Sequence, residues 1–95
     1  MRTTTSKKAE KLIMEFTARE SSTITYILRL MAETMEHYLK CESELKFHEG
    51  AEKKKYTDAM RTAHEKTFTL GYIAQCLGLQ VMPDWESNGI TVEVL

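Results

Sequence analysis

The chain has 95 residues, which is enough for one domain and leaves no room for a second, because a domain typically takes ~100 to 200 residues. Its 13 Lys and Arg residues nearly balance 14 Asp and Glu residues, which excludes a strong overall field that would attract nucleic acid or an anionic membrane. Two cysteines are too few for a disulfide scaffold, and four glycines with one proline favour long uninterrupted elements.

The N-terminal residues predict a polar arm followed by a short helix. Residues 1–5 (MRTTT) are expected to be a flexible arm, and residues 6–16 an amphipathic helix capped by Ser6, with one apolar face made by Ala9, Leu12, Ile13 and Phe16. Thr17 and Glu20 then form a T-x-x-E capping box, which indicates the start of a new helix. The apolar stripe changes phase near Thr17, although the pattern leaves open whether the two helices are continuous.

Two long helices joined by a short turn are predicted next. The second helix covers 17–47 and the third covers 51–78, with Gly50 in the turn and Gly78 at the end. Apolar residues recur at 4,3 spacing in both; they are Ile24, Leu28, Met31, Met35, Tyr38 and Leu45, and then Tyr56, Met60, Ala63, Thr67, Leu70, Ala74 and Leu77. Such helices form an antiparallel hairpin, in which residues whose numbers sum to roughly 100 lie at one level.

The end of the hairpin away from Gly50 is unusually apolar. The apolar residues of the stretch 24–32 cover about 240° of the helix, more than one neighbouring helix can bury. We call this end the base. Either the C-terminal tail covers it in a monomer or a second chain does, and we predict that it self-associates into a homodimer. The predicted contact residues are Ile24, Tyr26, Ile27, Leu30, Phe68, Tyr72, Ile73, Ile90, Val92 and Val94.

The C-terminal tail, residues 79–95, carries a strand pattern. Apolar residues alternate over 90–95, and Asn88-Gly89 just before them is a turn signal. A lone strand is unstable, so it must pair either with the segment 81–86 or with its own copy in a second chain. The predicted fold class is therefore all-α, with a long antiparallel hairpin, a short N-terminal helix and a small β-like tail.

Two acidic pairs provide the only pattern typical of metal-dependent chemistry. Glu33 and Glu36, with Glu49 and Glu52 later, resemble the acidic Mg²⁺-binding pattern of all-helical nucleotide pyrophosphohydrolases, because carboxylate oxygens on adjacent turns suit that ion. The second pair straddles Gly50 instead of lying beside the first on a helix. A solvated face of oppositely charged neighbours explains Glu33 and Glu36 better, and a Mg²⁺-dependent hydrolase is the third-ranked function.

The histidines and cysteines do not form a convincing site. His37 and His64 are expected to share a level but to point away from the seams, so surface positions are expected for both. Cys41 and Cys76 are too far apart along the hairpin for a disulfide and lack an oriented base. No catalytic, cofactor-binding or metal-ligating residue is predicted.

Charged residues surround the turn of the hairpin, which we call the tip. Lys53, Lys54 and Lys55 fall in the first turn of the third helix, where the helix dipole disfavours cations, with Glu49 and Glu52 alongside. These five residues are the predicted partner-binding residues. Together with a basic N-terminal arm of Arg2, Lys7, Lys8 and Lys11, the lysines also offer a less favoured nucleic-acid-binding alternative.

The absence of a chemical constellation, the apolar base and the charged tip together predict a non-enzymatic protein. We expect it to bind another macromolecule stoichiometrically, as an adaptor, inhibitor or regulator, with an unidentified protein as its partner. The polar N-terminus carries no signal-peptide pattern and no apolar run approaches ~18 residues, so we expect a cytoplasmic protein without membrane contact.

Overall fold

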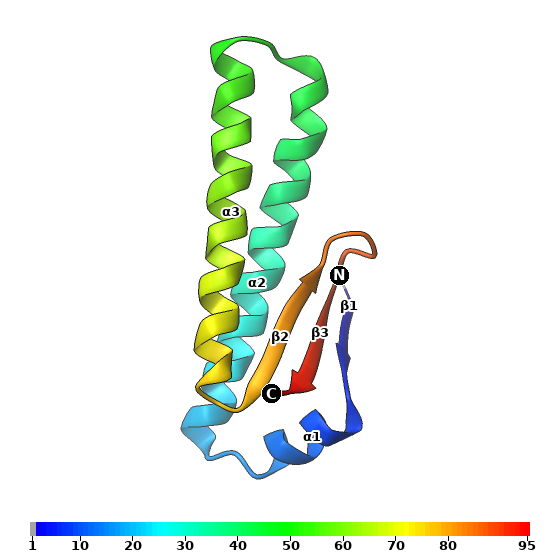
Figure 1. Ribbon diagram of the computed structural model, residues 1–95, viewed down its shortest axis with the longest axis vertical. Helices are drawn as coiled ribbons and strands as arrows, with labels where there is room; N and C mark the ends of the chain where they lie inside the picture. Colours follow the sequence, from blue (N-terminus) through cyan, green and yellow to red (C-terminus); the bar gives the residue numbers. More distant parts are fainter. Residues whose placement is uncertain (1) are drawn as a thin grey trace.

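Two long helices and a small sheet lie side by side in the computed structural model, which describes residues 2–95 (Figure 1). In chain order the elements are strand β1 (Arg2–Thr5), helix α1 (Lys7–Met14), helix α2 (Ala18–Glu44), the 3-10 turn η1 (Leu45–Phe47), helix α3 (Ala51–Gln75), strand β2 (Leu79–Asp84) and strand β3 (Gly89–Val94). Helices α2 and α3 form the antiparallel hairpin, and the sheet covers the half of it farther from the connecting turn (Figure 1). Residue 1, the start of the predicted arm, lies outside the described residues.

The sheet makes this a mixed α and β fold, so the predicted all-α class is wrong. Its strand order is β1-β3-β2, with β1 parallel and β2 antiparallel to the central strand β3. The predicted flexible arm contains β1, in which Thr3 pairs with Ile90 and Thr5 pairs with Val92. Three consecutive threonines have high β propensity, but they form a strand only because β3, from the other end of the chain, lies beside them.

Strand β3 finds its antiparallel partner within the chain, which decides between the two pairings left open by the sequence. Val92 pairs with Val81, and a tight turn joins β2 to β3.

In that turn Ser87 N–H donates to Asp84 Oδ1 over 3.3 Å. Hydrogen bonds from the Ser87 side chain, and then from the Ser87 backbone, lower the pKa of the Asp84 carboxyl, because they favour its charged form.

Side-chain caps separate the first two helices. The Ser6 hydroxyl accepts a hydrogen bond from Ala9 N–H and begins α1, which is shorter than predicted and ends at Met14. The capping box at the start of α2 is complete: Glu20 N–H donates to Thr17 Oγ1 over 3.2 Å, and Thr17 N–H donates to Glu20 Oε1 over 2.8 Å. Residues 15–17 therefore break the helix, and α1 and α2 are not continuous.

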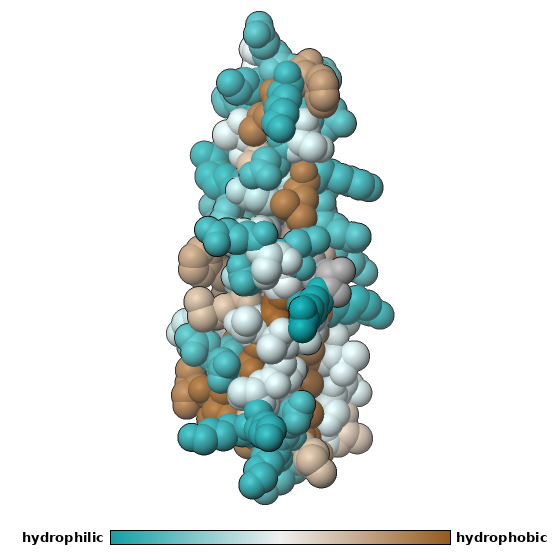
Figure 2. Space-filling view, turned by 90° about the vertical axis from the view of Figure 1, so that its right-hand side faces the viewer, coloured by the Kyte–Doolittle hydropathy of each residue, from teal (hydrophilic) through white to brown (hydrophobic). Residues whose placement is uncertain are grey.

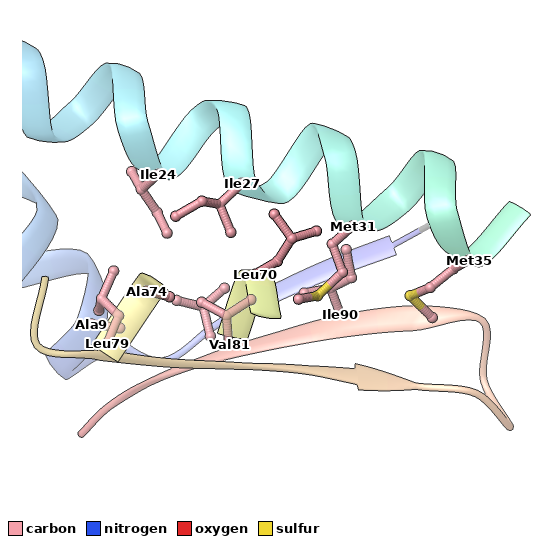
Figure 3. Close-up of a cluster of buried hydrophobic side chains, with 11 residues drawn as sticks. Ala9, Ile24, Ile27, Met31, Met35, Leu70, Ala74, Leu79, Val81 and Ile90 are labelled. Atoms are coloured by element: carbon pink, nitrogen blue, oxygen red, sulfur yellow. The ribbon is translucent and has the colours of Figure 1, made fainter. Parts of the chain in front are cut away.

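The hydrophobic core lies between the lower half of the hairpin and the inner face of the sheet (Figure 3). Its buried residues come from every layer and are Ala9, Ile24, Ile27, Met31, Met35, Leu70, Ala74, Leu79, Val81, Ile90 and Val92. Burial of one such large side chain contributes about 1.5–3 kcal/mol to folding. The sheet thus covers much of the apolar base.

The upper half of the hairpin extends beyond the sheet. In Figure 2 hydrophilic side chains cover most of this part of the face shown, and hydrophobic ones gather nearer the opposite end. Across residues 2–95, no helix combines the length and the apolar character that crossing a bilayer requires.

Candidate interaction surface

A groove with a volume of about 390 Å³ runs between helix α3 and strand β2. Its lining residues are His64, Thr67, Phe68, Gly71, Tyr72, Gln75, Gln80, Val81, Met82, Pro83 and Trp85. We call it the α3–β2 groove, and none of its lining residues is Lys, Arg, Asp or Glu.

The walls of the α3–β2 groove carry large apolar side chains that face solvent. Phe68 is 77% exposed and Tyr72 is 72% exposed, one turn apart on α3, while Met82 on β2 is 51% exposed. An isolated exposed apolar residue is ordinary, but several gathered around one hollow are typical of a binding surface.

The floor of the groove depends on a close approach of α3 to β2. A Cβ atom at position 71 would lie 3.1 Å from Val81 O, so the glycine lets the helix come this near to the strand backbone. Pro83, farther along β2, has no N–H to offer to another strand. The free edge of β2 is therefore partly covered by α3 and partly without donors.

An aromatic cluster closes the upper end of the groove. The ring of Trp85 lies 4.5 Å from that of Tyr38 and 4.8 Å from that of His64, and the Tyr38 and His64 rings meet edge to face at 4.9 Å. This cluster ties α2, α3 and the segment after β2 together. His64 is half-buried in it and is not the surface residue expected from the sequence.

The predicted base residues divide into two sets. Ile24 and Ile27 of α2 and Ile90 and Val92 of β3 are buried in the core of the single chain, so they offer little surface to a second one. Leu30 is half-buried, whereas the exposed set consists of Tyr26, Phe68, Tyr72, Ile73 and Val94. Of these, Phe68 and Tyr72 line the α3–β2 groove.

The tip is charged and open to solvent. The predicted residues Glu49, Glu52, Lys53, Lys54 and Lys55 are all exposed.

His48 connects the two sides of the tip. Its Nε2 lies 3.1 Å from Glu44 Oε2, its Nδ1 lies 3.7 Å from Glu52 Oε2, and its ring lies 5.0 Å from that of Tyr56. Phe47 is 79% exposed beside these charges.

The remaining candidate residues are not brought together. Glu33 and Glu36 are exposed on α2, and Glu49 and Glu52 lie at the tip, so the two acidic pairs do not meet. Among residues 2–95 there is no group of three or more His, Cys, Asp and Glu side chains placed to hold a metal ion.

Both cysteines are free thiols in different surroundings. Cys76 is exposed near the end of α3, whereas Cys41 is buried, with its Sγ 3.7 Å from His37 Nε2. His37 is exposed, as the sequence predicted.

Sequence reasoning missed one wall of the groove. Gln80, Met82 and Pro83 come from β2, and Trp85 follows it. The alternation of Leu79 and Val81 with polar or exposed neighbours was the available signal, but proline within a run argues against a central strand and the pattern is short.

Comparison of the chain with protein-family models, with curated proteins and with solved structures finds no match.

Proposed function

We propose that this chain is a small non-enzymatic interaction protein that binds another macromolecule stoichiometrically, as an adaptor, inhibitor or regulator. The observation that carries its self-association is the α3–β2 groove with Phe68 and Tyr72 about three-quarters exposed beside it, and its partner contact rests on the exposed Lys53, Lys54 and Lys55 at the tip. A monomeric domain gains nothing in stability from aromatic side chains left in water, so such a surface is best explained by a macromolecule that covers it.

The two ends of the molecule serve different contacts in this proposal. The protein is elongated, with extents of 50 × 21 × 18 Å. Strand β2, which forms one wall of the groove, lies beside the half of the hairpin opposite the tip (Figure 1). We place homodimerisation on the exposed apolar residues and the partner contact on Lys53, Lys54 and Lys55 at the tip, in a cytoplasmic protein. The tip extends beyond the sheet, so it stays accessible when the apolar residues of the other half are covered (Figure 1).

The test is affinity capture of proteins from a lysate of the native host, with quantification of the bound partner per chain. The variant Lys53→Glu, Lys54→Glu, Lys55→Glu should lose at least about 90% of the captured partner, because it reverses the charge of an exposed patch. The matched control is Lys7→Glu, Lys8→Glu, Lys11→Glu, which makes the same charge change on the exposed residues of α1 and should retain capture. Equal capture by both variants removes the tip from the proposal, and the absence of any stoichiometric partner rejects the function.

Nucleic acid is separated from a protein partner by a second measurement. We expect no binding of a mixed DNA and RNA pool in fluorescence polarisation, since the chain has a formal net charge of −1 and acidic residues flank the lysines. Binding that weakens steeply with added salt and is lost in the Lys53–Lys55 variant would replace the proposal with nucleic-acid binding.

A further inference from the structure

We propose that the α3–β2 groove is one half of a twofold interface whose occupant is a second copy of this chain, with Phe68 and Tyr72 of each copy packed over the groove of the other. The inference rests on the homodimer of the proposed function and identifies the surface through which it forms. That surface leaves out the predicted base residues that are buried in the core.

The first argument is that the surface is complementary to itself. A twofold interface brings the same patch of two subunits together, so one patch must supply both the protruding groups and the hollow that receives them. Phe68 and Tyr72 protrude from α3, and the hollow bounded by Met82 and Pro83 lies directly beside them. A twofold axis between these side chains and the hollow would bring each protrusion opposite the hollow of the other copy.

The second argument concerns charge. In a twofold interface a charged residue near the axis meets its own copy, and like charges so placed repel. The lining of the α3–β2 groove carries no carboxylate, ammonium or guanidinium group. Two exposed carboxylates beside the groove, Glu65 one turn before Phe68 on α3 and Asp84 between Pro83 and Trp85, are outside its lining and lie at the rim of the interface.

The third argument is the available area. Each large aromatic side chain buries ~150–250 Å² when it is fully covered, and a standard interface buries ~800 Å² on each partner. Phe68 and Tyr72, about three-quarters exposed, therefore supply about 220–370 Å², up to nearly half of the area that one partner needs, and the half-exposed Met82 adds to it. Phe47 at the tip is just as exposed but lies among charges.

The geometry also favours side-chain packing over extension of the sheet. Leu95 N–H donates to Gly78 O, so these two residues form a hydrogen-bonded pair of the antiparallel ladder. Hydrogen-bonded and non-hydrogen-bonded pairs alternate along the ladder, so the backbone polar groups of Val81 and Pro83 point away from β3. Val81 O there faces α3 at Gly71, and Pro83 has no N–H. A second copy is thus expected to pack on the groove walls without adding a strand to β2.

The experiment measures molar mass and tryptophan fluorescence over the same concentration series. Light scattering should show a rise from 11.0 kDa to about 22 kDa, twice the mass of one chain. Trp85 is the only tryptophan and lines the groove, so its emission should shift to shorter wavelength with the same midpoint concentration. The double variant Phe68→Ala, Tyr72→Ala should raise both midpoints at least about tenfold, as expected for central aromatic residues of an interface.

Two further variants control the interpretation. Phe47→Ala removes an equally exposed aromatic side chain from the other end of the molecule and should leave both midpoints unchanged. Met82→Glu changes the β2 wall at a half-exposed position and should also prevent dimerisation, because it places two carboxylates near the axis. Circular dichroism of each variant establishes that it is folded.

Each contrary result has a distinct meaning. A dimer that survives in the double variant, with no response of Trp85, overturns the inference while leaving a homodimer through another surface. A chain that stays monomeric up to about 1 mM overturns both the inference and the homodimer of the proposed function. In that case a different protein would occupy the groove. The capture experiment with the lysine variants would still test whether a partner binds at the tip.

Discussion

Gly78 lies at a point where the backbone leaves α3 and enters the sheet. Its φ is +78°, its N–H donates to Gln75 O over 2.9 Å, and its carbonyl accepts a hydrogen bond from Leu95 N–H over 3.0 Å. A side chain in this left-handed conformation brings its Cβ too close to the backbone. Glycine at this residue therefore lets the chain turn sharply enough for β2 to lie against α3.

Gly78→Ala should lower the free energy of unfolding by about 1–2 kcal/mol, measured by urea denaturation. The strain of the left-handed backbone is the main cause, because a Cβ would meet Leu12 only at 3.4 Å, which is ordinary contact. Gly78→Asn is the control and should cost less, since asparagine tolerates this conformation better. An equal loss of stability in both variants would indicate steric crowding by the added side chain and not backbone strain.

The two thiols should differ sharply in reactivity. At protein concentrations too low for self-association, Ellman's reagent should modify one thiol per chain quickly and the second only after denaturation, because Cys76 is exposed and Cys41 is 4% exposed. Cys76→Ser should abolish the fast phase. Two fast thiols in the folded wild-type chain would contradict the buried position of Cys41.

At the scale of the element, the start of α2 is defined by the side chains of Thr17 and Glu20. The reciprocal hydrogen bonds of this capping box satisfy two backbone N–H groups that would otherwise lack partners. Since both partners lie within four residues, the box could be read correctly from the sequence.

Thr17→Ala should destabilise the protein by about 1 kcal/mol, measured by thermal or urea denaturation. The control is Thr23→Ala, within α2, where the hydroxyl donates to Arg19 O of the same helix and removal should cost little or nothing. Similar losses in the two variants would show that the cap contributes no more than an ordinary helical threonine.

At the scale of the whole molecule, the core is confined to one half of an elongated shape. Cys41 is the last buried residue of α2 and Ala63 is the first buried residue of α3, so the hairpin between them has no buried side chain. The stability of that part comes from local helical contacts and from the neighbouring helix only.

Hydrogen exchange should therefore divide the hairpin into two regions. Amides of residues 42–58 should exchange through local opening at a lower free energy than those of residues 24–35 and 67–74, which contact the sheet. Mass spectrometry or NMR under native conditions measures this difference. Uniform protection along both helices would mean that the hairpin opens only with the whole protein.

Much of the helical part of this fold could be predicted from the sequence. The 4,3 spacing of apolar residues placed the two long helices, Thr17 and Glu20 placed the start of α2, and Gly50 placed the turn. These features depend on interactions between residues a few positions apart, which the sequence displays directly.

The sheet and the candidate surface could not be predicted in the same way. Strand β1 exists only because Thr3 and Thr5 lie beside Ile90 and Val92. In the folded chain three of the seven apolar residues of the stretch 24–32, which had looked uncovered, are buried. The apolar residues of the base could be counted from the sequence. Which of them are buried, as Ile27 is, and which are exposed, as Phe68 is, could not be predicted.

The sequence by itself determined the helical hairpin, its caps and turn, the near balance of charge and the excess of apolar residues at one end. Only the tertiary structure decided the mixed fold, the parallel pairing of β1 with β3 and the uncharged groove that β2 forms with α3. The physical reason is the range of the interactions. Helices are stabilised by hydrogen bonds and contacts within a few residues, whereas strand pairing and burial depend on segments that meet only when the whole chain has folded.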